Sequence, residues 1–297
     1  MFESKILNVA LTRAKIHFLP DVVYAQVPTL EKPNQLLQMD LLIPQIKRKL
    51  PAVIFVPGGG FVSANKARMP QLRMYLAERN FVVASINYRT VPNAKFPQPI
   101  EDVKSAIRFL KANAQKFNVD PEKIFVIGDS AGGYLAAFAA VTNGDKIFNV
   151  GENLHVSSEI VAAVDLYGLS DLTQIAADFP VELQNLYNSA GSVVSLFVNG
   201  VPALGGSDGG ILAHPVSAQR ANPINYITKN SAPMLLMHGT EDSVVSPAQT
   251  DLLFQALRTH GLESERYLIP NAGHSDEHWQ QENVLGVITE FLIRHVL

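Results

Sequence analysis

The chain has 297 residues, a length that suits one large α/β domain, and 47% of its residues are hydrophobic while 17% are charged. This balance is typical of a globular protein and excludes disordered, collagen-like and coiled-coil chains. A net charge of −3 provides no basic surface, so we expect no nucleic-acid partner, and the absence of cysteine excludes disulfides, thiolate metal sites and a cysteine nucleophile.

The first twenty residues mix apolar with charged side chains and contain no apolar core of the length that a secretory signal requires. The longest apolar stretches, such as 52–57 and 81–85, have the length of strands and are too short to span a membrane. We therefore expect a cytoplasmic chain without a membrane partner.

Short β-rich runs alternate with segments of helical period from residue 52 onward, which is typical of βαβ units. Most of the runs are continuous Val, Ile, Leu and Phe, as expected for parallel strands that helices cover on both faces. We predict an α/β fold with a mostly parallel central sheet, in a single domain over residues 1–297. The expected strands are Gln38–Ile43, Ala52–Pro57, Phe81–Tyr88, Ile124–Gly128, Ile160–Tyr167, Met234–His238 and Glu265–Ile269.

Three segments have apolar residues three or four positions apart, which predicts amphipathic helices over Pro99–Phe117, Pro247–His260 and Glu282–Val296. Residues 176–212 lack such a period, and several glycines stand near their end. We expect this segment to be an insertion that forms a cap or lid near the ligand site; a helix and loop with only a packing role is the alternative. Its apolar run 193–198, if exposed, would offer a lid surface or a homodimer face.

The expected strand at 124–128 leads into the sequence GDSAG at 128–132 and then into a helical run, Leu135–Val141. A G-x-S-x-G sequence between a strand and a helix predicts a nucleophile elbow, in which Ser130 is held exposed on a sharp turn. The two glycines are needed because a Cβ at either position would meet the neighbouring strand and helix. The alternative is a glycine-rich turn whose serine has no role.

A serine nucleophile needs a base to accept its proton and an acid to orient that base. In this fold class the three residues follow one another as serine, acid and histidine. The loop after the strand at 234–238 supplies Asp242, and the loop after the strand at 265–269 supplies His274. We therefore predict Ser130, Asp242 and His274 as the catalytic residues.

Neighbouring residues offer alternatives for some of these roles. Glu241 adjoins Asp242 and is a second candidate for the acid. His238 lies at the end of a strand, where a structural role is favoured. Asp129 precedes the serine on a sharp turn, and we expect it to form hydrogen bonds within its loop.

Acyl transfer also needs hydrogen-bond donors for the developing oxyanion. Three glycines, 58–60, follow the strand at 52–57, and their bare amides can approach a tetrahedral intermediate closely. We predict the amides of Gly59, Gly60 and Ala131 as the oxyanion hole. A phosphate-binding loop is the alternative, but neither G-K-[ST] nor G-x-G-x-x-G spacing follows.

From Leu36 to the last residue the chain resembles carboxylesterases of the α/β-hydrolase fold, in particular those related to hormone-sensitive lipase and to bacterial feruloyl and acetyl-xylan esterases. The resemblance implies the triad Ser130, Asp242 and His274 and the same oxyanion hole. One departure is Pro57, which stands where the family usually has the histidine of H-G-G-G. Besides GDSAGG, the resemblance is carried by INYR at 86–89, FPQPIEDV at 96–103, VDP at 119–121, ANPIN at 221–225 and HGTED at 238–242.

We thus expect a serine carboxylesterase that hydrolyses short acyl or aryl esters of small molecules through an acyl-enzyme, without a cofactor or metal. An arylformamidase or a small peptidase on the same triad stays open, because these substrates also pass through a tetrahedral oxyanion. A non-catalytic binding protein is less favoured. So is a metallohydrolase: HSDEH at 274–278 matches the H-x-x-E-H zinc pattern with His274 and His278, but Gly273 places His274 in a loop.

Overall fold

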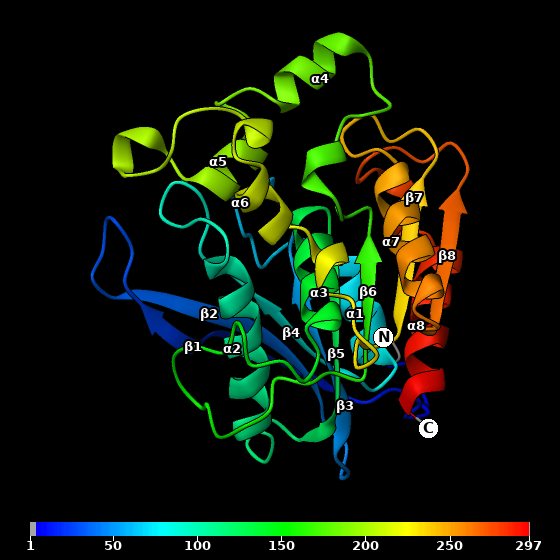
Figure 1. The fold of residues 1–297 in the computed structure, drawn as a ribbon. Coiled ribbons are helices and arrows are strands. Elements are labelled where there is room, and N and C mark those ends of the chain that lie inside the picture. The colour runs from blue at the N-terminus through cyan, green and yellow to red at the C-terminus, as the bar shows by residue number, and fades with distance from the viewer. Residues whose placement is uncertain (1–3, 297) are drawn as a thin grey trace.

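The computed structural model describes residues 4–296, and within them one sheet of eight strands has the order β1-β2-β4-β3-β5-β6-β7-β8 (Figure 1). The antiparallel pairs are β1 with β2 and β2 with β4, and the remaining neighbours are parallel. The predicted α/β fold with a mostly parallel sheet is therefore confirmed. The strands are β1 (Ile16–Val27), β2 (Gln35–Pro44), β3 (Leu50–Val56), β4 (Val82–Ile86), β5 (Val119–Asp129), β6 (Ala162–Leu166), β7 (Met234–Gly239) and β8 (Ser264–Ile269).

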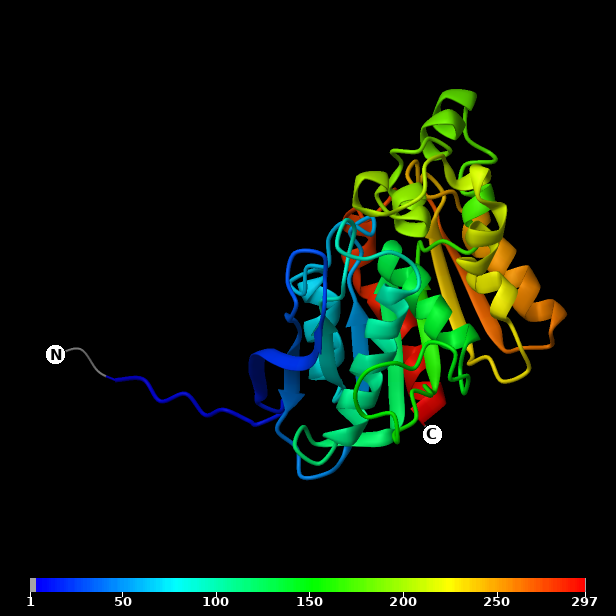
Figure 2. The same cartoon turned by 60° about the vertical axis from the view of Figure 1, so that its left-hand side comes forward.

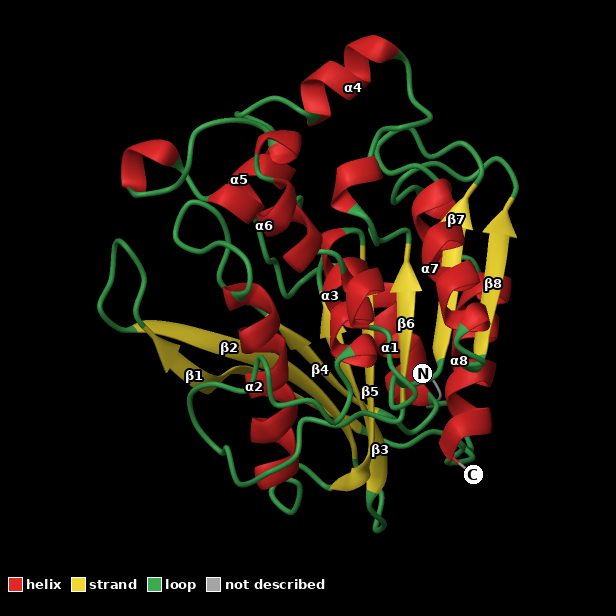
Figure 3. Ribbon diagram, viewed as in Figure 1, coloured by secondary structure: helices red, strands yellow, loops and turns green. Residues whose placement is uncertain are grey.

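Helices cover both faces of this sheet (Figure 3). Apolar residues of α2, α3 and α7 pack on one face, and those of α1 and α8 pack on the other. These two layers bury the sheet, which explains why most of its strands are continuous apolar runs. The α-helices are α1 (Pro70–Glu78), α2 (Gln98–Ala112), α3 (Ala131–Val141), α4 (Val181–Tyr187), α5 (Val193–Asn199), α6 (Pro215–Arg220), α7 (Ala248–Thr259) and α8 (Glu282–Val296).

Each expected strand overlaps a strand of the sheet, but β1 was not predicted. It lies at the edge of the sheet, pairs only with β2, and contains Pro20 and a shift of register between Leu19 and Val22. A proline has no N–H to give to a ladder, and it is tolerated in a strand mainly at such an edge. Only the end of the amino-terminal stretch that argued against a secretory signal, from Ile16 onward, belongs to this half-exposed strand.

The helix expected over Pro99–Phe117 ends earlier than predicted, at Ala112. Its last apolar residues, Ala114 and Phe117, are still buried, but they lie on turns that lead into β5. Helical spacing continues through these turns, so the sequence pattern overestimated the length of α2. The described residues before β1, from Ser4 onward, extend away from the body of the molecule (Figure 2). Within residues 4–296, none of the helices combines the length and apolar character that crossing a bilayer would require.

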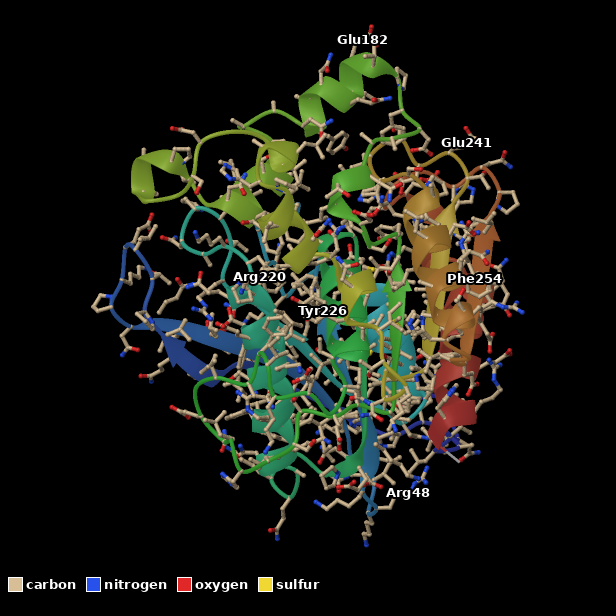
Figure 4. All side chains as sticks on the ribbon, in the orientation of Figure 1. Arg48, Glu182, Arg220, Tyr226, Glu241 and Phe254 are labelled. Carbon is tan, nitrogen blue, oxygen red and sulfur yellow. The ribbon has the colours of Figure 1, made fainter. Side chains whose placement is uncertain are left out.

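Much of the chain between β6 and β7, including α4 and α5, lies above the carboxyl ends of the parallel strands, and its last part lies beside α3 (Figure 1). This segment contains the expected insertion, 176–212. Its outermost helix, α4, buries no residue, and Figure 4 shows Glu182 at its outer end. Besides α4, α5 and α6 it contains the 3-10 turns η1 (Leu172–Gln174), η2 (Pro202–Leu204), η3 (Ile211–Ala213) and η4 (Pro223–Tyr226).

The apolar run 193–198, which suggested an exposed lid or homodimer face, is mostly turned into the molecule. Val194 and Phe197 on α5 are each 1% exposed, and Val198 is 6% exposed. Burial of this run removes the reason for expecting a homodimer through it.

One carboxyl group is enclosed between β6 and the start of α3. Asp165 is 1% exposed, and its Oδ1 accepts a hydrogen bond from the Gly168 amide at 2.8 Å. Its Oδ2 is buried without a hydrogen-bond partner among the residues that the structure describes. Burial raises the pKa of Asp165 to about 7, although the Gly168 hydrogen bond acts in the opposite direction.

We expect Asp165→Asn to change how stability depends on pH. The folded wild-type chain keeps a proton on Asp165 that the unfolded chain releases, so its stability falls as pH rises from about 4 to 7. The asparagine of the variant does not titrate, so the stability of the variant does not fall in this way. The difference in free energy of unfolding, variant minus wild type, should therefore grow over that range by up to about 4 kcal/mol.

Urea unfolding followed by circular dichroism at pH values between 4 and 8 measures this difference. The exposed Asp208 provides the control, since Asp208→Asn should leave a difference that does not vary with pH in this way. A difference for Asp165→Asn that stays constant from pH 4 to 8 would show that the buried carboxyl is ionised in the folded chain.

Candidate active site

Ser130 occupies the sharp turn between β5 and α3, as predicted for a nucleophile elbow. Its backbone has φ 54° and ψ −121°, a conformation that residues other than glycine rarely adopt. A Cβ on Gly128 would lie 2.0 Å from the Gly132 carbonyl oxygen, and a Cβ on Gly132 would lie 1.9 Å from the Val56 oxygen. Glycine is therefore required at both positions for the strand, turn and helix to approach so closely.

The structure brings the three predicted catalytic side chains together from separate loops. The hydroxyl of Ser130 donates a hydrogen bond to Nε2 of His274 over 2.9 Å, and Nδ1 of His274 donates to Oδ2 of Asp242 over 2.7 Å. Asp242 follows β7 and His274 follows β8, so both lie at the carboxyl ends of parallel strands. The contacts form one line from hydroxyl to imidazole to carboxylate.

The alternative acid, Glu241, is turned away from this line. Its side chain is exposed, whereas Asp242 is 4% exposed, and Figure 4 shows Glu241 at the outside of the loop above β7. The amides of Val244 and Val245 donate to Oδ1 of Asp242, each at 2.9 Å, which leaves Oδ2 for His274. The loop thus fixes the direction in which the carboxylate points.

His238 contributes to the same carboxylate, although the sequence indicated only a structural histidine at a strand end. It is fully buried, and its Nε2 lies 2.9 Å from the Val245 carbonyl and 3.2 Å from Oδ2 of Asp242. Burial alone would raise the pKa of Asp242, but hydrogen bonds from His238 and His274 outweigh it and hold that pKa well below its usual range. Asp242 is therefore a carboxylate at neutral pH.

Aromatic side chains position the loop that carries His274. The ring of Tyr167 meets the imidazole edge to face, with centroids 4.8 Å apart, and also packs on Trp279. The indole N–H of Trp279 donates to the Gly273 carbonyl at 3.0 Å, directly before the histidine. Trp279 is fully buried, so its interaction with the loop is shielded from water.

His274 and His278 do not form the two-histidine face that the zinc pattern would require. His274 is bound to Asp242, whereas Nδ1 of His278 lies 3.0 Å from Oδ1 of Asp276 in the turn η5 (Glu277–Gln280). No group of three or more potential metal ligands gathers anywhere in residues 4–296.

The three glycines after β3 form a loop beside Ser130. Gly59 and Gly60 have positive φ angles of 150° and 59°, and a Cβ on Gly60 would face open space. Their amides donate no hydrogen bond to the part of the chain that the structure describes. Ala131 is the first residue of α3, where an amide has no acceptor within its helix. None of the three predicted donors is thus paired with another group of the described residues.

The residue at the usual histidine position, Pro57, is held by other groups. The hydroxyl of Tyr88 donates to the Pro57 carbonyl at 2.8 Å, and the next amide, that of Gly58, donates to Oδ1 of Asp129 at 2.8 Å. Asp129, expected to form hydrogen bonds within its own loop, instead fixes the neighbouring glycine loop. No local sequence signal pointed to this contact, since Gly58 and Asp129 are far apart in the chain.

Phe61, directly after the glycines, connects this loop to the segment above the sheet. Its ring stacks on Phe197 of α5 with centroids 4.0 Å apart, and Tyr134 of α3 packs edge-on against both rings. Ser130 itself is 8% exposed. These buried rings form an aromatic wall behind the glycine loop.

The sheet order, the elbow after β5, the carboxylate after β7 and the histidine after β8 together define an α/β-hydrolase with the site geometry of serine hydrolases. The BD-FAE family model matches residues 39–257. The chain belongs to the BD-FAE family.

Known proteins similar to this chain include esterases. Esterase LipC of Mycobacterium tuberculosis is 30% identical over 246 residues, which cover 82% of this chain and 57% of that protein. A truncated carbohydrate esterase from gut microbiota superposes with a TM-score of 0.80 at 28% identity, covering 96% of this chain and 98% of that structure. A bifunctional GH43-CE protein of Bacteroides eggerthii has a TM-score of 0.76 at 30% identity, covering 94% of this chain and 38% of that one. The chain spans about half the length of the curated relatives it matches.

Proposed function

We propose that this chain is a serine carboxylesterase, with Ser130, Asp242 and His274 as its catalytic triad. The observation that carries the proposal is the line of two hydrogen bonds, 2.9 Å and 2.7 Å long, from the serine hydroxyl through the imidazole to the carboxylate. Membership of the BD-FAE family and the esterases among its relatives support the same reaction class.

In the first half of the reaction, Oγ of Ser130 attacks the acyl carbon while its proton moves to Nε2 of His274. The carbonyl oxygen becomes an oxyanion, and the amides of Gly59, Gly60 and Ala131 donate hydrogen bonds to it. The bond to the alcohol oxygen then breaks, and the imidazolium returns its proton to that oxygen. Asp242 stabilises the imidazolium throughout, which its low pKa permits.

In the second half, His274 removes a proton from water as the water oxygen attacks the acyl-enzyme. A second oxyanion forms in the same place, and its collapse releases the carboxylic acid as Ser130 regains a proton from the imidazolium. Every proton transfer uses residues of this chain. The reaction needs no metal or cofactor.

The segment between β6 and β7, with 176–212 at its centre, acts in this proposal as a cap on a single α/β-hydrolase domain. The stacked rings of Phe61 and Phe197 limit the space beyond the glycine loop, which favours short acyl groups. A small-molecule ester is the proposed substrate. We also propose a cytoplasmic location.

A substrate panel tests the reaction class and the acyl preference together. It comprises p-nitrophenyl acetate, butyrate and octanoate, a feruloyl ester, an aryl formamide and an aminoacyl anilide. We expect the acetate and butyrate esters to have the highest kcat/KM and the octanoate a lower one. A higher kcat/KM for the formamide or the anilide would assign the site to an arylformamidase or a peptidase instead.

Phe197→Leu is expected to raise the ratio of kcat/KM for octanoate to that for acetate by about fivefold, because a smaller side chain opens the aromatic wall. Phe148→Leu is the matched control. Phe148 belongs to the same aromatic cluster and is buried, but it packs on Phe96 and Phe138 rather than on Phe61. An equal change of the ratio in both variants would mean that Phe197 does not limit the acyl group.

A further inference from the structure

One arginine outside the predicted triad reaches two of the loops that form the site. Arg68 lies between β3 and α1, and its side chain is 33% exposed. Its Nε donates to Oδ2 of Asp129 at 2.7 Å, directly before Ser130. Its second terminal nitrogen donates to Oγ of Ser275 at 2.7 Å, directly after His274. A single guanidinium thus joins the nucleophile elbow to the histidine loop.

The position of Arg68 is itself fixed by its surroundings. The side chain of Arg73, on α1, donates to the carbonyl of Arg68 at 2.8 Å and to that of Ala67 at 2.9 Å. The Arg68 amide donates to the Asn65 carbonyl at 3.1 Å. These contacts fix the backbone from which the guanidinium reaches the two loops.

The carboxylate that Arg68 contacts lies beside the reacting atoms. Asp129 is fully buried, and its Oδ1 accepts the amide of Gly58. A Cβ on Gly58 would lie 2.8 Å from Oδ2 of Asp129 and 3.0 Å from Cβ of Ser130. The carboxylate therefore adjoins both the nucleophile and the loop that supplies oxyanion donors.

A buried negative charge at this place opposes the formation of a second negative charge on the substrate oxygen, because charges interact strongly away from water. The Arg68 guanidinium supplies the compensating positive charge. The Tyr167 hydroxyl also donates to Oδ2 of Asp129, at 3.4 Å, but it is neutral. Arg68 is thus the cation that the structure places against this carboxylate.

We propose that Arg68 is a positioning residue of the esterase reaction: it neutralises Asp129 beside the oxyanion hole and holds the elbow and the histidine loop in register. The inference rests on the proposed function. Arg68 acts through Asp129 and Ser275 and does not touch the substrate.

Three variants separate the charge of Arg68 from its hydrogen bonds. Arg68→Lys keeps the positive charge, Arg68→Gln keeps a hydrogen-bond donor without charge, and Arg68→Gln combined with Asp129→Asn removes both charges. The readouts are kcat and KM for p-nitrophenyl acetate and the rate of labelling by a fluorophosphonate probe, with circular dichroism to follow folding. Arg79→Gln, which removes an arginine just after α1 that pairs with Glu282, is the matched control.

We expect Arg68→Gln to lower kcat and the labelling rate by about 30-fold with KM within about twofold, because transition-state charge is stabilised less well. Arg68→Lys should lower kcat by no more than about fivefold. On a logarithmic scale, kcat of the double variant should lie at least halfway from the Arg68→Gln value to the wild-type value. Arg79→Gln should match the wild type.

A double variant as slow as Arg68→Gln, or an Arg68→Gln variant as fast as the wild type, would overturn the inference. If Arg68→Gln does not fold, the comparison passes to Arg68→Lys and the double variant, and a 30-fold loss in either contradicts a charge-neutralising role. A wild-type chain that reacts with neither ester nor probe would contradict the proposed function and the inference together. Wild-type activity with unaffected Arg68 variants would contradict the inference alone.

Discussion

Replacing Ser130 with alanine is expected to lower kcat/KM for p-nitrophenyl acetate by about 10⁴- to 10⁶-fold, because it removes the hydroxyl that is hydrogen-bonded to His274 and would attack the acyl carbon. The oxyanion donors remain in place, so a small activity above that of water should survive. Labelling by the fluorophosphonate probe should be lost completely.

Initial rates and mass spectrometry of the labelled chain measure the two effects. The control is Ser207→Ala, at an exposed serine, which should keep wild-type rates and label uptake. Retained ester turnover in the Ser130 variant would remove this residue from the mechanism. Retained labelling at another residue would identify a different nucleophile.

Replacing Asp242 with asparagine should have the second largest effect, a loss of about 10⁴-fold in kcat. An asparagine can donate to Nδ1 of His274 and so stabilise the wrong tautomer of the imidazole, and it cannot stabilise the imidazolium by charge. Glu241→Gln is the matched control, since that side chain is exposed and points away from the triad. We expect its rates to lie within about twofold of the wild type. An equal loss in both variants would reassign the acid.

Asp242→Asn should also lower stability at neutral pH. The folded-state pKa of Asp242 is depressed, chiefly because hydrogen bonds from His238 and His274 outweigh the effect of burial. The carboxylate therefore adds stability above its unfolded pKa, and that contribution is lost as pH falls below about 4. The difference in free energy of unfolding between wild type and variant should accordingly be largest near pH 7 and shrink in acid.

The residues proposed for catalysis were predictable because each follows a strand with a distinct local pattern. The elbow motif requires particular glycines, and the order of acid and histidine follows from the order of parallel strands. Geometry then distinguished Asp242 from Glu241, which adjacent sequence positions alone could not do.

Other features depend on contacts between distant parts of the chain. The side chain of Arg68 donates a hydrogen bond to Ser275, which lies 207 positions further along the chain, and no sequence pattern around either residue indicates this contact. The arrangement of the segment between β6 and β7 could not be predicted because its helices are short and have no sustained period. Similarly, the hydroxyl of Tyr88 holds the loop at Pro57, and the sequence does not indicate which acceptor this hydroxyl binds.

The irregularity of β1 bears on how the folded chain behaves at high concentration. An unpaired edge of a sheet offers N–H and C=O groups on which strands of other molecules can add. In β1 that row is interrupted by Pro20, which has no N–H, and by Asp21, whose φ of 56° turns the backbone out of line. The break that hid this strand in the sequence thus makes the β1 edge a poorer template for strand addition.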